Sequence, residues 1–386
     1  MSLLPSISSS LQLPPLSLYV HVPWCVRKCP YCDFNSHAQQ GELPESAYLH
    51  ALFADLDSEL ALVQGRQLGS IFIGGGTPSL MGADFYQQLL PGIDKRIPFA
   101  TDIEITLEAN PGTFEQARFG GFRAAGINRL SLGVQSFDDR CLKALGRIHS
   151  GDDAFAAIES AHALGFERIN LDLMHGLPEQ TPAMALADLR QGISLGTAHL
   201  SWYQLTIEPN TEFHSRPPRL PEDEQLWAIQ DQGQALLAES GFAQYEISGY
   251  SRAGQQCRHN LNYWRFGDYI GIGAGAHGKL TDLSQQQLIR RSKPRQPKAY
   301  LAAPCADQAR VVAREELALE FMMNVLRLNQ GVEVPLFAAS TGLALAQIQP
   351  RLDRARTLGL LGADLTRLAP TPHGRRFLND LLELFV

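Results

Sequence analysis

Residues Leu16–Phe34 read LSLYVHVPWCVRKCPYCDF and combine two signals that set the architecture. The first seven residues form an apolar, β-branched run, which is typical of a buried strand. Cys25, Cys29 and Cys32 follow with the spacing C-x3-C-x2-C. Thiol groups placed directly after a first strand predict a sheet protein with its metal chemistry at the carboxyl ends of the strands.

The run at residues 16–22 is the first of six similar runs. The others occupy residues 70–76, 103–109, 129–135, 168–174 and 200–206. Longer stretches with helical spacing separate them, and their apolar positions recur every three to four residues. Strand–helix alternation predicts a parallel sheet with βαβ crossovers. Six units are fewer than the eight of a closed barrel, so we predict an α/β fold with an open, partial (β/α)6 barrel.

One side of each central run is polar. Parallel strands buried on both faces are normally apolar throughout. The polar positions are Glu104, Thr106, Glu108, Ser131, Gly133, Gln135, Asn170 and Asp172. The alternate positions are aliphatic and should face the helices. We therefore expect the polar set to line the barrel interior, near the strand ends where such barrels place their chemistry.

The chain divides into three predicted parts. Residues 1–15 are predicted to be a flexible leader interrupted by prolines. Residues 16–280 hold the barrel and a following extension that is rich in aromatic residues and glycine. Residues 300–386 are predicted to form a small, mainly helical domain, which ends in two short strands and a helix and is similar to a winged helix. In an acidic chain we expect this domain to pack or to dock a partner rather than to bind DNA.

Composition narrows the classes of function. The 386 residues carry a net charge of −7, with 45% hydrophobic and 19% charged residues, as globular enzymes do. The negative charge disfavours a nucleic-acid surface, and no apolar run approaches the roughly 20 residues of a membrane span. The first sixteen residues lack the positive start of a signal peptide. Three of the six cysteines are crowded together, which favours metal ligation in a reducing cytoplasm over disulfides.

The cysteine triad has three interpretations. A [4Fe–4S] cluster ordinarily takes four cysteines, so three ligands with no fourth in a matching position leave one iron open, as catalytic metal sites do. The alternatives are a zinc site with His37 as fourth ligand, and reduced thiols in the core. The spacing directly after a first barrel strand favours the cluster.

The triad and its neighbouring segments resemble the radical S-adenosylmethionine (SAM) superfamily and, within it, the coproporphyrinogen III dehydrogenase-like family. The segments are YVHVPWC (19–25), GGGTPS (74–79), LEANPGT (107–113), GVQSFDD (133–139) and DLMHGLPEQT (172–181). The resemblance runs from about residue 16 to the C-terminus. It implies that SAM binds the open iron and that one electron cleaves its sulfonium, which gives a 5′-deoxyadenosyl radical.

The resemblance also assigns residues to SAM, motif by motif. They are Tyr19, Tyr31, Gly75, Gly76, Thr77, Glu108, Gln135, Arg147 and Asp172. The glycine turn follows a strand, where absent Cβ atoms let a ligand approach the backbone, although such a turn alone is more often structural. Glu108, Gln135 and Asp172 belong to the polar set, and each alone is equally explained as a satisfied core group. Arg147 rests on the resemblance, and its alternative is a solvated arginine at a helix end.

Two features favour heme handling over dehydrogenation. Dehydrogenases of this family usually have a longer N-terminal segment and a fourth cysteine two positions after the third, where this chain has Phe34. Relatives with C-x3-C-x-Y-C-x-F are similar to the HemW-type heme chaperones, which also carry H-N-x-x-Y-W. Here that motif supplies His259, Asn260, Tyr263 and Trp264 as heme contacts, with an imidazole ligand for iron and flat rings for the porphyrin.

The heme motif has other interpretations. A capped histidine beside a buried aromatic pair is the structural one. Cys257 is an alternative soft ligand, and His175 and His277 are weaker candidates at the barrel mouth.

Two functions of different classes therefore stand. The first is a heme carrier that keeps a [4Fe–4S] cluster and SAM and passes heme to acceptor proteins, with membrane respiratory enzymes among the candidates. The second is an oxygen-independent coproporphyrinogen III dehydrogenase, which decarboxylates two propionates by radical chemistry. Whether the chain is an enzyme stays open, as do its electron donor and its oligomeric state, for which a homodimer is one option. We expect a cytoplasmic protein without a membrane span and without a nucleic-acid partner.

Overall fold

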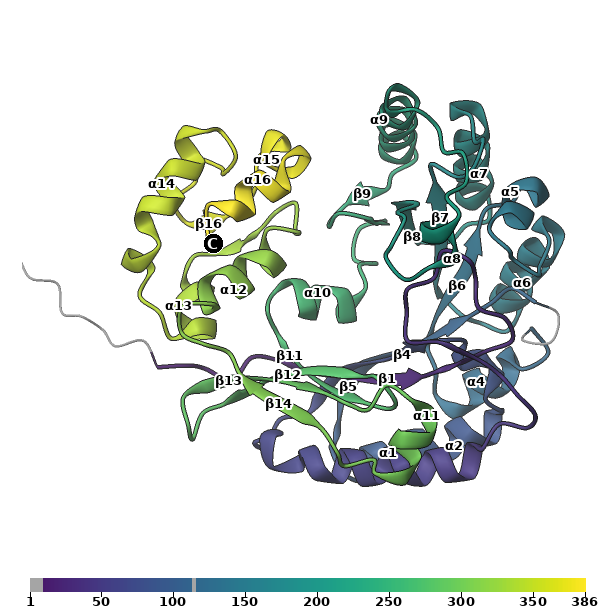
Figure 1. Cartoon of the computed structure of the whole chain (residues 1–386), viewed down its shortest axis with the longest axis horizontal. Helices are drawn as coiled ribbons and strands as arrows, with labels where there is room; N and C mark the ends of the chain where they lie inside the picture. The colour runs from purple at the N-terminus through teal and green to yellow at the C-terminus, as the bar shows by residue number, and fades with distance from the viewer. Residues whose placement is uncertain (1–9, 113–115) are drawn as a thin grey trace, which may run out of the picture.

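The computed structural model describes residues 10–112 and 116–386. Within them, a mixed sheet of twelve strands forms the body of the molecule (Figure 1). The strand order is β14-β13-β12-β11-β1-β4-β5-β6-β7-β8-β10-β9. Every pair from β11 to β8 in this order is parallel. The two edge strands of the described sheet, β14 and β9, do not pair with each other, so the barrel is open.

Six strand–helix units build the parallel part and confirm the predicted partial barrel. The strands are β1 (Leu16–Val22), β4 (Leu68–Gly75), β5 (Phe99–Ala109), β6 (Arg129–Gln135), β7 (Arg168–His175) and β8 (His199–Gln204). The helices are α1 (Glu45–Glu59), α2 (Ala83–Asp94), α4 (Phe119–Ala125), α5 (Asp139–Ala144), α6 (Gly151–Ala163), α7 (Pro182–Ser194), α8 (Glu212–Ser215) and α9 (Asp223–Glu239). None of the helices in the described ranges is long and apolar enough to cross a membrane.

The alternation of side chains along the strands explains the layers. Leu107 on β5 pairs in register with Leu130 on β6, and both side chains are buried in the main core against the helices. On the inner side, the Ser131 hydroxyl donates to Asp172 Oδ2 at 3.0 Å, and Asn170 Nδ2 donates to Asp172 Oδ1 at 2.8 Å. The predicted polar lining of the barrel is therefore confirmed on these strands.

The chain after α9 extends both edges of the sheet and covers its inner face. The elements are β9 (Ala243–Gln244), β10 (Gly249–Ser251), α10 (Arg258–Trp264), β11 (Asp268–Ile272), β12 (His277–Asp282), β13 (Gln287–Ser292), α11 (Pro297–Ala302) and β14 (Gln308–Val311). Strand β11 runs parallel to β1, and β12–β14 continue as an antiparallel meander. Helix α10 lies over the inner face of the sheet, whereas α1 and α2 cover the outer face (Figure 1).

A second hydrophobic core organises the C-terminal helices. The elements are α12 (Leu317–Val325), β15 (Val332–Glu333), α13 (Pro335–Thr341), α14 (Gln349–Thr357), β16 (Arg367–Leu368), α15 (Pro372–Arg376) and α16 (Leu378–Glu383). Phe321, Phe337 and Leu352 are fully buried in this core. Two short strands were predicted near the end of the chain. The structure has one strand there, β16, which pairs with β15, and one isolated bridge between Leu361 and Pro370. The residue limits of the predicted domains stay a prediction.

The predicted leader lies partly outside the described residues, at positions 1–9. Its described part joins the two bodies of the molecule. Leu11 is buried in the second core, and the Gln12 N–H donates to the Ala339 carbonyl on α13 at 2.9 Å. The Asp268 N–H at the start of β11 donates to the Pro15 carbonyl at 3.0 Å. Residues 10–15 are thus fixed by contacts at both ends rather than free.

Candidate functional site

The cysteine loop is held at the carboxyl end of β1 by its own backbone. Trp24 and Cys25 form the short strand β2 (Trp24–Cys25), which pairs in parallel with β3 (His37–Ala38). The Gln39 N–H donates to the Cys25 carbonyl at 2.8 Å. His21 Nε2 lies 2.9 Å from the Asn35 carbonyl, so the last inner side chain of β1 binds the far end of the loop. The three thiols therefore lie on a loop that is closed and anchored at both ends.

All three cysteines line one cavity of about 320 Å³ at the mouth of the barrel. Eight of the nine residues predicted for SAM line it too: Tyr31, Gly75, Gly76, Thr77, Glu108, Gln135, Arg147 and Asp172. Tyr19 does not. Its hydroxyl lies 2.9 Å from His21 Nδ1, and its ring packs beside Phe72. Tyr19 thus supports the histidine that anchors the loop, and SAM contact by Tyr19 stays a prediction.

The glycine turn after β4 contacts the start of the cysteine loop through backbone hydrogen bonds. The Gly76 N–H donates to the Val22 carbonyl and the Thr77 N–H to the Trp24 carbonyl, both at 2.7 Å. A Cβ on Gly76 would lie 2.5 Å from the Trp24 carbonyl oxygen. Gly75 has φ +112°, a backbone conformation that glycine adopts without strain. The absence of a Cβ atom at Gly76 therefore lets the cysteine loop lie close to this turn.

Two half-buried carboxyl groups, Glu108 on β5 and Asp172 on β7, line the cavity. Glu108 Oε2 accepts the Gly75 N–H at 3.1 Å. Burial, reinforced by the charge of Asp172, raises the pKa of Glu108 to about 8. Burial also raises the pKa of Asp172, opposed by hydrogen bonds from Asn170, Ser131 and Ser201. Such perturbed acids in a cleft are typical of a functional site.

Arg147 connects the cavity wall to the cysteine loop. Its Nη2 donates to the Gly133 carbonyl at 2.7 Å and to Asn110 Oδ1 at 2.6 Å, and its Nη1 lies 3.6 Å from Cys29 Sγ. The half-buried side chain therefore bridges these segments and is not a solvated helix end. Asn110 Nδ2 in turn donates to Thr77 Oγ1 at 3.2 Å. This chain of contacts fixes the glycine turn, β6 and the loop relative to one another.

The structure adds residues to the site that the sequence prediction missed. Tyr203 on β8 donates its hydroxyl to Gln135 Oε1 at 2.9 Å, and Asn110 and Ser201 also line the cavity. Gln135 has φ +68°, a strained conformation for a residue with a Cβ, and such strain is frequent at functional sites. Ser201 and Tyr203 alternate with buried apolar residues on β8, which is the same signal as on the central strands.

The donor set fits a [4Fe–4S] cluster with one open iron. Three thiols share one cavity with the cationic side chains of Arg27, Lys28 and Arg147. Positive side chains offset the negative charge that thiolate ligands give to a cluster, and burial raises the pKa of Cys25, which ligation to iron reverses. In the described part of the chain, no three His, Cys, Asp or Glu side chains are grouped as they would be around a single metal ion. A four-iron cluster takes each thiolate on a different iron, so its ligands need not converge.

The heme motif lies on α10, inside the open barrel. His259 is only 3% exposed. Its ring stacks on Phe72 at a centroid distance of 4.7 Å and meets the edge of Tyr263 at 4.4 Å. Burial lowers the pKa of His259 to about 3, so the imidazole is neutral, as an iron ligand must be. Its Nδ1 is buried without a hydrogen-bond partner in the described structure.

The remaining motif residues and alternative ligands lie in different surroundings. Asn260 Nδ2 approaches the Tyr245 hydroxyl at 3.5 Å, and the Arg327 guanidinium covers the Trp264 ring at 4.3 Å. Cys257 is buried with its Sγ 3.5 Å from Glu104 Oε1. His175 packs against Trp202 at the end of β7, and His277 is exposed on β12. Neither these histidines nor Cys257 lines the cysteine cavity.

Comparison with known proteins agrees with this geometry. Residues 19–191 match the Radical SAM superfamily model, and residues 312–377 match the HemN C-terminal domain. The chain is 53% identical to heme chaperone HemW of Escherichia coli strain K12, over 97% of this chain and 99% of the relative. It is 51% identical to heme chaperone HemW of Haemophilus influenzae, with the same coverage.

A solved structure supports the fold. Coproporphyrinogen III oxidase (HemN) from Escherichia coli superposes with a TM-score of 0.81, at 23% identity, over 98% of this chain and 91% of that one. This likeness confirms the radical SAM architecture with its C-terminal domain. The identity to HemW proteins is well above 30% over nearly the whole chain. The chain therefore belongs to the HemW family of the radical SAM superfamily.

Proposed function

We propose that this protein is a heme chaperone, which binds heme, retains a [4Fe–4S] cluster with SAM at the barrel mouth, and passes heme to an acceptor protein. The observation that carries the proposal is the identity of 53% and 51% to two heme chaperones, each over 97% of this chain. The residue at position 34 agrees with it. Phe34 is 62% exposed at the rim of the cavity, where dehydrogenases of the wider family carry a further cysteine.

The cavity supplies groups suited to the two implied cofactors. Cys25, Cys29 and Cys32 would hold the cluster, which supplies an open coordination position and one electron when it is bound. Glu108 and Asp172 offer carboxyl acceptors to the cationic and hydroxyl groups of SAM. Arg147, held by the Gly133 carbonyl and Asn110, offers a donor to a carboxylate and a positive charge beside Cys29.

Heme is assigned to the neighbourhood of α10. A neutral imidazole at His259 is a suitable ligand for heme iron, and the rings of Tyr263 and Trp264 nearby offer flat apolar surface to a porphyrin. The imidazole is now enclosed by Phe72 and Tyr263. Iron ligation therefore requires a displacement of α10 or of Phe72, and we propose that loading and release of heme proceed through such a movement.

The test of the heme ligand is a spectral titration of reconstituted, oxygen-free protein with heme. His259→Ala should lose most of the heme signal and leave the absorbance of the cluster unchanged. His175→Ala is the matched control, since His175 is also buried against an aromatic ring but lies outside α10. An unchanged heme spectrum in His259→Ala would refute the assignment.

One observation favours a second function. Eight of the nine residues expected for SAM line the cavity, which supports radical chemistry of the kind that a coproporphyrinogen III dehydrogenase performs. Incubation with coproporphyrinogen III, SAM and a reductant without oxygen distinguishes the two. We expect no protoporphyrinogen above the level of a Cys29→Ser control. Turnover that depends on Cys29 would establish the enzyme instead.

Partners and location belong to the same proposal. Acceptors that receive heme, including membrane respiratory enzymes, are expected to dock transiently. A cytoplasmic site of action agrees with six free cysteines. We further propose a homodimer that depends on the cluster, for which the molar mass of reconstituted and iron-free protein is the test.

A further inference from the structure

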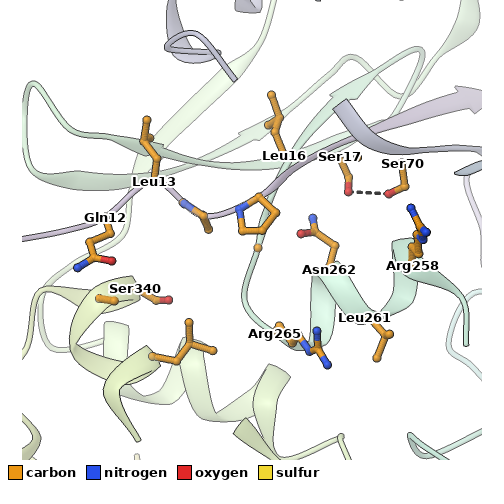
Figure 2. A pocket seen from close by; sticks show the side chains of 16 residues that line it. Gln12, Leu13, Leu16, Ser17, Ser70, Arg258, Leu261, Asn262, Arg265 and Ser340 are labelled. Atoms are coloured by element: carbon orange, nitrogen blue, oxygen red, sulfur yellow. Dashed lines mark hydrogen bonds between the residues drawn. The ribbon is translucent and has the colours of Figure 1, made fainter. Parts of the chain in front are cut away.

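A second cavity, of about 470 Å³, lies at the amino-terminal end of the barrel (Figure 2). Three distant parts of the chain build its walls: residues 12–17 with the start of β4, helix α10 with its C-terminal turn, and helix α13. The lining comprises Gln12, Leu13, Pro14, Pro15, Leu16, Ser17, Gly69, Ser70, Arg258, Leu261, Asn262, Arg265, Gly267, Leu336, Ala339 and Ser340. Its volume falls in the range of small-molecule sites.

The cavity uses a different face of α10 from the heme motif. Arg258, Leu261 and Arg265 are spaced by three and four residues, so they share one face of the helix and its C-terminal end. His259 points away from them, toward Phe72 inside the barrel. Figure 2 shows Arg258 and Arg265 on the α10 side and Leu13 and Leu16 on the opposite wall. His259 itself does not line this cavity.

The charges of the lining favour an anion. Two charged residues line the cavity, both of them arginines, in a chain with a net charge of −7. The Arg258 guanidinium pairs with the Asp102 carboxylate and donates to the Asp102 carbonyl, both at 2.7 Å, on an exposed edge where such contacts are weak. Arg265 is exposed, and its side chain has no ion-pair or hydrogen-bond partner among the described residues. An incoming carboxylate would thus meet one free guanidinium and one that is weakly held.

The uncharged lining residues indicate the chemistry of the rest of the ligand. Leucines and prolines form the walls, while the Ser17 and Ser70 hydroxyls bond to each other at 2.7 Å and offer little to a polar ligand. The two arginines are seven residues apart, about 10 Å along a helix axis. Two cations at that separation match two carboxylates on one apolar body better than a single one. The lining contains no His, Cys, Met or Tyr, which are the usual protein ligands of heme iron.

We propose that this cavity binds the porphyrin macrocycle through its apolar face and its two propionates, without a ligand to iron. The inference rests on the proposed heme function, because that function brings a porphyrin dicarboxylate to the protein. It adds a holding site at the amino-terminal end of the barrel, whose lining does not include the iron-ligating candidate His259. Metal-free protoporphyrin IX should therefore bind this site as tightly as heme does.

Fluorescence titration of the full chain with protoporphyrin IX tests the proposal. Arg265→Glu should weaken the affinity about tenfold or more, because a charge-assisted contact becomes a repulsive one. Arg265→Lys should retain most of the affinity. Ala339→Phe should also weaken it by filling the space between α13 and α10. Arg314→Glu is the control, an exposed arginine outside the lining, and should bind as the unmodified protein does.

Two comparisons separate this site from the others. His259→Ala should leave protoporphyrin affinity unchanged, so loss of heme ligation and loss of this site are distinguishable. The dimethyl ester of protoporphyrin IX, which has no carboxylates, should bind weakly and with no difference between the unmodified protein and Arg265→Glu. Absence of protoporphyrin binding, or equal affinity in unmodified protein, Arg265→Glu and Ala339→Phe, would overturn the proposal. So would displacement of the porphyrin by equimolar palmitate, since the site would then accept any fatty carboxylate.

Discussion

At the scale of single residues, Arg147 does the most to connect the parts of the site. One guanidinium contacts β6 through the Gly133 carbonyl, the loop after β5 through Asn110, and the cysteine loop through Cys29. These three segments approach one another only in the folded barrel. The arginine therefore positions the cavity wall whether or not it also contacts SAM.

Replacing Arg147 tests this assignment. Arg147→Ala should weaken SAM binding to the reconstituted protein by about tenfold or more, because a charged donor in the cavity wall is lost and Asn110 loses its partner. Calorimetric titration with SAM measures the change. Arg140→Ala is the control, because Arg140 is 80% exposed and pairs only with Asp138 at the surface. Equal SAM affinity in the unmodified protein, Arg147→Ala and Arg140→Ala would show that Arg147 does not contribute to SAM binding.

The raised pKa of Glu108 predicts that the free energy of unfolding decreases as the pH rises. Its pKa is raised to about 8 in the folded protein, so the folded state binds a proton that the unfolded state has released at neutral pH. This contribution to stability is fully present below the ordinary glutamate pKa and is lost as pH rises through about 8. Without SAM, the free energy of unfolding should therefore fall between pH 6 and pH 9.

Urea unfolding of SAM-free protein at several pH values measures this slope. Glu108→Gln removes the titrating group, so its curve should be flatter than that of the unmodified protein over pH 6 to 9. Glu42→Gln, at an exposed position, should leave the slope unchanged. Identical slopes in the unmodified protein and Glu108→Gln would contradict the assignment.

At the scale of elements, Glu104 on β5 fixes α10 inside the barrel. Its Oε1 accepts the Arg258 N–H at 2.8 Å, at the first residue of the helix, where backbone donors lack partners. Its Oε2 pairs with Arg129 at 3.3 Å, and both side chains of that pair are buried. One carboxylate thus orients the heme-motif helix and neutralises a buried arginine.

Breaking this contact should loosen α10. Glu104→Gln leaves Arg129 as an uncompensated buried charge, which costs about 3 kcal/mol or more of the free energy of unfolding, and heme affinity should fall with it. Asp102→Asn is the matched control, because it breaks only the exposed ion pair with Arg258 and should leave the free energy of unfolding nearly unchanged. Chemical denaturation and heme titration of both variants provide the measurements. A Glu104→Gln protein as stable as Asp102→Asn would contradict the role of Glu104.

The elements also show how far sequence reasoning reaches. The strand runs were predictable because burial on both faces requires an apolar run, and β1 and β6 have the predicted bounds. The inner polar side chains on β5, β6 and β7 followed from alternation, whereas Tyr203 was missed although β8 shows the same alternation. The placement of α10 was not predictable, since its partners Phe72 and Glu104 lie more than 150 residues away in the sequence. The function of Gly76 likewise depends on the Trp24 carbonyl, a contact that exists only after folding.

At the scale of the whole molecule, two cores meet around α10. The barrel core packs the strands against their helices, and the second core packs the C-terminal helices against Phe266 and Leu11. Residues 10–15 and α10 lie between the two bodies, and the second cavity opens between them. A movement of the C-terminal helices relative to the barrel would change both faces of α10 at once. This arrangement is suited to a protein that must take up heme and release it again.

Transfer of heme to an acceptor distinguishes a heme chaperone from a protein that only binds heme. Reconstituted protein is loaded with heme, freed of excess heme, and incubated without oxygen with membranes from heme-depleted cells, while reduced-minus-oxidised spectra record the α-bands of membrane cytochromes. We predict that these bands appear with the loaded protein, and that heme bound to serum albumin at the same concentration restores them more slowly. If the α-bands appear equally fast with albumin and with this protein, or do not appear with the loaded protein, this protein does not deliver heme.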